Sequence, residues 1–223
     1  MAKEKKRIGV LLCGCGHRDG SEVHEATFTL LAIDQAGAES ICFAPSGNTR
    51  FVRDHMTGEN VKDTRNMIVE SARIARGNIR DLTSASANEL DALIIPGGQG
   101  AALNLSTFLI DGIDCSVLPD VSRIIVDMAR AKKPIGGICI APATIARALQ
   151  KAKIAATLTC GTDADVARAI EEMGHKHKNC EPSDCVVDQE NKIATTPAYM
   201  TATSIGEVWQ GINKLVKAVK EMV

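Results

Sequence analysis

The chain has 223 residues and carries 26 Lys and Arg against 27 Asp and Glu, a formal net charge of −1. This balance excludes the basic surface of a nucleic-acid-binding protein, and four Phe, one Tyr and one Trp offer few stacking platforms for single strands. With 45% hydrophobic and 24% charged residues, the composition is that of a folded globular protein rather than a disordered one.

Neither a membrane span nor a secretion signal is evident in the sequence. The longest apolar run, 135–143, is far shorter than the ~20 residues that cross a bilayer. The first residues, Met-Ala-Lys-Glu-Lys-Lys, lack the apolar core of a signal peptide, and eight cysteines without such a signal favour free thiols. We expect no membrane or nucleic-acid partner and a cytoplasmic location, or the mitochondrial matrix if a presequence has been removed.

Strand-like and helix-like segments alternate along the chain. Short apolar runs predict strands over 7–13, 39–44, 92–95, 135–139 and 158–160, and a hairpin over 185–188 and 192–195. Helical spacing predicts helices over 23–36, 65–76, 120–131, 163–173 and 205–223, and another from Ala141 or Pro142. Asp19 or Ser21 is available to cap the first helix. Without linkers or repeats, this alternation predicts one α/β domain over residues 1–223, with a three-layer, doubly wound, mostly parallel sheet.

Ligands of such sheets bind beyond the carboxyl ends of the strands, where segments 14–25, 96–100 and 136–142 should meet. The third segment is a strand, then Cys139, then an immediate helix start, which is the arrangement of a nucleophile elbow. A helix N-terminus stabilises a thiolate and an oxyanion, so we expect Cys139 to be the most reactive of the eight thiols. The alternative is that Cys139 is an ordinary buried core thiol.

A glycine-rich turn ends the strand over 92–95. Its backbone N–H groups would complete an oxyanion hole with the amide of Ile140. A plain turn is the alternative. The glycines at 97, 98 and 100 lack the dinucleotide-binding spacing, because position 102 is Ala.

Two carboxylates lie one turn apart at the start of the first helix. Glu22 belongs to the first turn, where acidic residues interact favourably with the helix dipole. Glu25 lies deeper and is less easily explained that way. We therefore predict that Glu25, rather than Glu22, reaches the thiol as a general acid or base.

A rival metal site is present in the sequence. His175, His177, Cys180 and Cys185 are four potential zinc ligands in a short segment. An extended strand after Gly174 would send the two histidines to one face and Cys180 to the other. We therefore interpret these residues as part of an edge strand and expect no metal.

The segment before the closing helix contains the only tyrosine. Pro197 cannot donate to a sheet and bars a regular helix at Thr196, so the chain must turn there. We predict that Tyr199 borders the pocket, where its hydroxyl would donate to a bound carbonyl or to the Glu25 carboxyl. The alternative is that its ring packs on the closing helix.

Taken together, these motifs resemble the PfpI and Parkinson-associated deglycase superfamily, within the class I glutamine amidotransferase-like fold. The likeness is strongest to its ElbB type, the enhancing-lycopene-biosynthesis or isoprenoid-biosynthesis proteins with glyoxalase-type activity, and it covers nearly the whole chain. The motifs that carry it are Gly14-Cys15-Gly16, Asp19-Gly20-Ser21-Glu22-Val23-His24-Glu25, Thr57-Gly58-Glu59, Ala72-Arg73-Ile74-Ala75-Arg76-Gly77, Ile138-Cys139-Ile140-Ala141-Pro142 and Thr195-Thr196-Pro197-Ala198-Tyr199-Met200.

The resemblance implies a flavodoxin-like sheet with Cys139 as nucleophile and Glu25 as its carboxyl partner. It further implies that the amides of Gly98 and Ile140 hold the oxyanion. One departure is the absence of the histidine that the superfamily often has after its elbow. Here no His occurs between Cys139 and His175, and Thr159, Cys160 and Asp163 fill that region.

The function that the resemblance implies is a glutathione-independent glyoxalase of the lyase class, which converts glyoxal or methylglyoxal into a 2-hydroxy acid without a cofactor. It also implies a homodimer, and 101–118 is a candidate interface or lid. Two alternatives stand beside it. The first is a thiol redox sensor or non-catalytic binding protein associated with isoprenoid metabolism. The second is an amidase or glutaminase, which normally requires a His partner.

Overall fold

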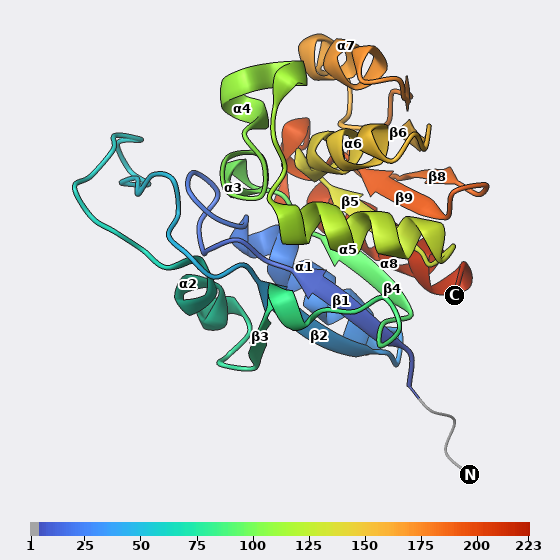
Figure 1. Cartoon of the computed structure of the whole chain (residues 1–223), viewed down its shortest axis with the longest axis horizontal. Helices are drawn as coiled ribbons and strands as arrows, with labels where there is room; N and C mark the ends of the chain where they lie inside the picture. The colour runs from blue at the N-terminus through green and yellow to red at the C-terminus, as the bar shows by residue number, and fades with distance from the viewer. Residues whose placement is uncertain (1–4) are drawn as a thin grey trace.

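A seven-stranded sheet forms the centre of the computed structural model, which describes residues 5–223 (Figure 1). Its strand order is β3-β2-β1-β4-β5-β9-β8. The strands are β1 (Arg7–Leu11), β2 (Glu39–Ala44), β3 (Ile79–Asp81), β4 (Ala92–Ile95), β5 (Ile135–Ile138), β8 (Val186–Asp188) and β9 (Ile193–Thr196). All neighbours pair in parallel except β8 and β9, which form an antiparallel hairpin. The expected doubly wound, mostly parallel sheet is confirmed.

Helices cover both faces of this sheet (Figure 1). They are α1 (Val23–Gln35), α2 (Met67–Ile74), α3 (Gln99–Leu103), α4 (Phe108–Asp111), α5 (Pro119–Arg130), α6 (Ala141–Lys151), α7 (Ala164–Glu172) and α8 (Ile205–Glu221), with short 3₁₀ turns η1 (Leu82–Ser84), η2 (Gly112–Asp114) and η3 (Ala198–Met200). Helices α1 and α8 pack against each other, as do α5 and α6.

Two consecutive glycines of β5 show how closely these layers pack. A Cβ atom on Gly136 would lie 3.0 Å from Leu215 of α8, whereas one on Gly137 would lie 2.7 Å from Ile145 of α6. Neighbouring residues of a strand face opposite sides of the sheet, so α8 and α6 lie on opposite faces. Glycine at both positions lets the central strand approach both helices.

The sheet ends in short strands on both edges. Strands β3 and β8 each have three residues. A separate pair of parallel two-residue strands, β6 (Thr157–Leu158) and β7 (Lys176–His177), lies beside β8. The buried carboxylate of Asp188 joins the two sheets, because it accepts a hydrogen bond from the backbone N–H of Thr157 at 2.7 Å.

The first helix begins differently from the expectation. Neither Asp19 nor Ser21 caps α1; Glu22 is the N-cap, and its carboxylate accepts from the Glu25 N–H at 2.7 Å. The two expected caps are used inside the preceding loop instead. Ser21 accepts from the N–H of Cys13 at 2.9 Å, and Asp19 accepts from the N–H of Arg53 at 2.8 Å.

Other boundaries differ by a few residues. The helix expected over 65–76 is the shorter α2, capped by the Asn66 side chain, and the hairpin strands differ from the expectation by one residue at three of their four ends. Within 5–223, no helix combines the length and the apolar character that a membrane span needs. The expectation about a signal peptide concerns the first residues of the sequence, and residues 1–4 lie outside the part of the chain that the structure describes.

Candidate active site

The loop between β5 and α6 holds Cys139 in a left-handed backbone conformation. Strand β5 ends at Ile138, α6 begins at Ala141, and Cys139 has a φ of 61°. A non-glycine residue in this region costs about 1–3 kcal/mol, and such strain is concentrated at functional sites. The N–H of Cys139 donates to the carbonyl of Thr196 at 2.9 Å, which fixes the turn against the end of β9. This is the sharp strand-to-helix turn that the sequence predicts.

Two backbone amides point at the Cys139 sulfur. They belong to Gly98 and Ile140, the two residues expected to form the oxyanion hole. Gly98 has a φ of 88°, which an L-residue rarely adopts, and it lies directly before α3. Ile140 is the N-cap residue of α6. The structure therefore brings the thiol and both predicted amides together at the carboxyl ends of β4 and β5.

Glu25 lies beside the same thiol. Its fully buried carboxyl accepts from the N–H of Gly97 at 2.9 Å and from the N–H of Tyr199 at 3.4 Å, and it shares a hydrogen bond with Cys139. A Cβ atom on Gly97 would lie 2.8 Å from the carboxyl oxygen and still closer to the Cβ of Cys139. Only glycine fits between the thiol and the carboxyl group.

Burial changes the protonation of this carboxyl group. Burial, and after it the nearby charge of Glu22, raise the pKa of Glu25 to about 8, against the opposing hydrogen bonds from Gly97, Tyr199 and Cys139. Loss of hydration disfavours the charged form of any carboxyl group. At neutral pH Glu25 therefore holds its proton in most molecules.

The thiol is also held in its neutral form. Burial raises the pKa of Cys139 well above its ordinary value, and the charge of Glu25 adds to the effect, while the amides of Gly98 and Ile140 oppose it. The expectation of a resting thiolate at the helix N-terminus is therefore wrong in direction. Two amides do not replace the hydration that a thiolate loses when its side chain is only 7% exposed. The resting site is a thiol beside a carboxylic acid.

Glu22 has a structural position at the start of α1. Its side chain caps the helix, and its own N–H donates to the carbonyl of Gly97 at 3.0 Å. The expectation that Glu22 belongs to the first helical turn is wrong by one position, because Glu22 is the N-cap residue directly before α1. Glu25, rather than Glu22, faces Cys139, as predicted.

Tyr199 contacts the site through its backbone. It lies in η3, before the closing helix α8, and its N–H donates to Glu25. Its hydroxyl is 2.8 Å from Nδ1 of His24, so the predicted hydroxyl contact with Glu25 is wrong. Ala198, with a φ of 44°, makes the turn that presents the Tyr199 amide. The turn expected at Pro197 is present, and it directs the backbone amide of Tyr199, rather than its hydroxyl, toward Glu25.

Cys160 occupies the region of the absent histidine. Its sulfur is fully buried, accepts from the N–H of Ala143 in the first turn of α6, and interacts electrostatically with Cys139. Burial raises the pKa of Cys160. The N–H of Cys160 donates to Nε2 of His177 at 3.2 Å, which turns that ring toward the backbone. Asp163 caps α7, and the Thr159 hydroxyl accepts from the N–H of Gly161 at 3.0 Å. No imidazole replaces the usual shuttle in this segment.

The rival zinc ligands do not converge. His175 uses both ring nitrogens on the backbone, with Nε2 at 2.8 Å from the carbonyl of Ala146 and Nδ1 accepting from Ala156 at 3.2 Å. His177 contacts Cys160 instead. Across residues 5–223, no three His, Cys, Asp or Glu side chains gather as a metal ion would require.

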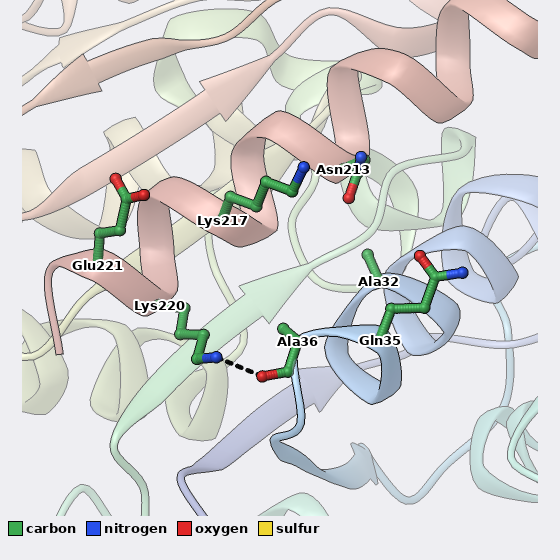
Figure 2. Close-up of a pocket in the computed structure, with 7 residues that line it drawn as sticks. All are labelled: Ala32, Gln35, Ala36, Asn213, Lys217, Lys220 and Glu221. Carbon is green, nitrogen blue, oxygen red and sulfur yellow. Dashed lines mark hydrogen bonds between the residues drawn. The ribbon is translucent and has the colours of Figure 1, made fainter.

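A cleft of about 550 Å³ between α1 and α8 is a separate feature (Figure 2). Its lining residues are Ala32, Gln35, Ala36, Asn213, Lys217, Lys220 and Glu221. Helices rise about 1.5 Å per residue, so Gln35 lies about 15 Å along α1 from Glu25. The Lys220 ammonium group donates to the carbonyl of Ala36, which closes the C-terminal end of α1. The cleft contains neither a thiol nor a paired carboxyl group, and it is not the candidate active site.

Curated proteins with related sequences span nearly the whole chain. No protein-family model matches the chain. The human glutamine amidotransferase-like class 1 domain-containing protein 3, mitochondrial, is 42% identical over 97% of this chain and 83% of its own length. The rat ES1 protein homolog, mitochondrial, is 41% identical over 99% of this chain and 85% of its own length. Both relatives are named as mitochondrial, which agrees with the second of the two expected locations, the mitochondrial matrix.

Solved structures give the same result. The isoprenoid biosynthesis protein with amidotransferase-like domain from Ehrlichia chaffeensis is 37% identical, covers 97% of this chain and 100% of its own, and superposes with a TM-score of 0.90. A DJ-1 superfamily protein from Salmonella typhimurium, 19% identical, shares the fold with a TM-score of 0.57 over 97% of this chain and 95% of its own. The resemblance stated from the motifs is confirmed, and the chain belongs to the ES1 family of glutamine amidotransferase-like class 1 domain proteins.

Proposed function

We propose that this protein is a glutathione-independent glyoxalase that converts glyoxal and methylglyoxal into 2-hydroxy acids. One observation carries the proposal: the Cys139 thiol lies between a buried carboxyl group and two backbone amides. A nucleophile, a proton carrier and an oxyanion hole are the three parts that this chemistry needs. Membership of a family related to the DJ-1 superfamily supports a cysteine nucleophile.

The burial of the site favours a small substrate. Cys139 is 7% exposed and Glu25 is fully buried. A dicarbonyl of two or three carbons needs little room beside these groups, whereas a glycated protein side chain needs much more. Burial also favours a neutral substrate, because it penalises charge at this position.

The first step is addition of the thiol to the aldehyde. The Cys139 sulfur forms a bond with the aldehyde carbon, and the carbonyl electron pair moves to oxygen, where the amides of Gly98 and Ile140 donate to it. Ionised Glu25 accepts the thiol proton and passes it to this oxygen. With a pKa of about 8, Glu25 is ionised in about a tenth of molecules at pH 7.

The second step moves hydrogen between two carbons. Glu25 removes the proton from the carbon bonded to sulfur, which gives an enediol, and returns a proton to the neighbouring carbon. The first carbon is thereby oxidised to a thioester while the second is reduced to an alcohol, so no external oxidant enters. Water then hydrolyses the thioester, releases the 2-hydroxy acid and restores the thiol.

Turnover in heavy water tests this route. Purified protein is incubated with methylglyoxal in deuterium oxide, and the 2-hydroxy acid is analysed by NMR. We expect deuterium on the hydroxyl-bearing carbon, because the enediol is reprotonated through the exchangeable carboxyl group. Product that carries only the original hydrogen would indicate a hydride shift and contradict the role of Glu25. Loss of turnover in Cys139→Ser separates enzymatic product from background.

A second candidate is a thiol sensor or non-catalytic binding protein associated with isoprenoid metabolism. The raised pKa of Cys139 favours the non-catalytic binding protein, because a protonated thiol adds slowly to a carbonyl and is also oxidised slowly by peroxide. The name of the Ehrlichia relative, an isoprenoid biosynthesis protein, supports the association. Absence of dicarbonyl turnover, together with selective oxidation of Cys139 by peroxide, would favour this candidate over the glyoxalase.

A further inference from the structure

The segment between β7 and β8 forms a tight turn with a cysteine on each side. The N–H of Asp184 donates to the carbonyl of Glu181 at 3.0 Å, which closes the four-residue turn Glu181-Pro182-Ser183-Asp184. Proline at the second position favours such a turn, whose end Cα atoms lie within about 7 Å of each other. Cys180 and Cys185 flank this turn, and the turn therefore brings the two residues next to each other.

The two thiols are neighbours with access to solvent. Both side chains are half-buried, and each interacts with the charges of the turn. The Cys180 thiol donates to the carbonyl of Glu181 at 3.4 Å, so it points toward the turn rather than away from it. Cys180 is also among the groups that raise the pKa of Cys185. A disulfide requires Cα atoms about 4.4–6.8 Å apart, and a closed four-residue turn directs the residues on its two sides toward each other.

No metal ion competes for this pair among the described residues, because His175 and His177 are bound elsewhere. We propose that Cys180 and Cys185 are a redox-active dithiol that closes to a disulfide by exchange with a low-molecular-weight disulfide. One protein thiolate attacks the reagent, which forms a mixed disulfide and releases one thiol. The second protein thiol displaces the other half, so two electrons and two protons pass from the protein to two reagent thiols.

Electrostatics set the speed and direction of this exchange. Burial, with the charge of Asp184 next, raises the pKa of both thiols to about 11. A small thiolate fraction makes exchange slow at neutral pH and faster as pH rises. Thiols of high pKa are also poor leaving groups, so the closed disulfide reopens slowly.

The dithiol lies at a junction of the fold. Asp184 forms an ion pair with Lys214 of α8 at 3.2 Å, and its carbonyl accepts from the Thr196 hydroxyl at 2.7 Å. Thr196 in turn holds the N–H of Cys139. A disulfide would tie the end of β7 to the start of β8 beside these contacts, without using any residue of the proposed reaction.

Exchange with oxidised glutathione tests the proposal. The reduced full-length protein is incubated with the reagent at mildly alkaline pH, alkylated, and analysed by intact mass and peptide mapping. We expect wild type to lose two hydrogen atoms through a Cys180–Cys185 cross-link. Cys180→Ser and Cys185→Ser should each keep one glutathionyl group on the remaining thiol, because nothing resolves it. Cys42→Ser, which changes a buried thiol of β2, should behave like wild type.

Two results would overturn the proposal. One is stable glutathionylation of both Cys180 and Cys185 in wild type, which would show that the pair does not close. The other is a cross-link that involves a different cysteine. Thermal unfolding of each variant checks that it is folded before exchange. Failure here leaves dicarbonyl turnover at Cys139 unaffected, and loss of that turnover leaves this exchange unaffected.

Discussion

The two thiol regions of this protein differ in what surrounds the sulfur. At Cys139, backbone amides from Gly98 and Ile140 face the sulfur, and a buried carboxyl group lies opposite. At Cys180 and Cys185, the nearby groups are Asp184 and a second thiol. Burial raises the pKa in both places, so the pKa alone does not distinguish them. The neighbouring groups distinguish the two regions, because amides stabilise negative charge on a substrate oxygen, whereas a neighbouring thiol resolves a mixed disulfide.

The largest expected effect comes from exchanging the nucleophile. Cys139→Ser should lower kcat/KM for methylglyoxal by about 10⁴ or more, the scale of losing a nucleophile that acts with partner groups. Cys180→Ser is the matched control and should leave kcat/KM unchanged, since it lies outside the site. Equal losses in both variants, measured by steady-state kinetics, would remove the distinction between the two regions.

The carboxyl partner should give the next largest effect. Glu25→Gln should lower turnover by about a hundredfold or more, the usual scale for a general acid–base group. Glu22→Gln should mainly destabilise α1, by a few tenths of a kcal/mol, because it weakens a cap and a favourable interaction with the helix dipole. If kinetics and thermal unfolding show the reverse order, Glu22 rather than Glu25 carries the proton.

The ionisation of Glu25 should affect both turnover and stability as the pH changes. Glu25 acts when ionised, so kcat/KM should rise about tenfold between pH 7 and a plateau above the pKa of about 8. Its pKa is raised on folding, so the native state binds more protons between about pH 4.5 and 8, and the free energy of unfolding falls as pH rises through that window.

A comparison with Glu25→Gln isolates this contribution. The variant lacks the ionisable group, so its free energy of unfolding, measured by urea denaturation, should fall less between pH 5 and pH 8. Wild-type and variant curves that run parallel across this range would show that Glu25 keeps an ordinary pKa in the folded protein.

The smallest effect is expected at the tyrosine. Tyr199→Phe removes a hydroxyl that bonds His24 at the surface, at a cost of about 1 kcal/mol or less, and leaves the backbone contact with Glu25 intact. Both kcat and KM should stay close to wild type. A large fall in kcat would show that the hydroxyl moves toward the substrate in the complex.

Much of this architecture could be predicted from sequence because its signals are local. Buried parallel strands read as short apolar runs, and the turn glycines mark where they end. The pairing of Cys139 with Glu25 followed from one additional rule, that the carboxyl ends of parallel strands meet at one edge. Strand β3 was missed because three residues carry no detectable period, whereas the short strand β7 lies where an edge strand is expected after Gly174.

The predictions that were wrong depend on non-local features, namely contacts across the fold and depth of burial. Neither Asp19 nor Ser21 caps α1, because Asp19 binds the N–H of Arg53 and Ser21 binds the N–H of Cys13 across the loop. A local sequence pattern does not show these contacts. The direction of the Cys139 pKa depends on depth of burial, and a motif does not report depth. The partner of the Tyr199 hydroxyl lies on α1, 175 residues away in sequence, so its identity required the fold.

The short edge strands have a consequence for assembly. At one edge, β3 has only three residues whose outer side could pair with another strand. At the other edge, β8 is equally short, and the side chain of Asp188 already accepts a hydrogen bond from Thr157. Edges of this kind resist the addition of further strands, which protects a sheet from aggregation. Two copies of this chain therefore have little to gain from joining their sheets into one, and the homodimer expected from the family would have to bury helices and loops instead.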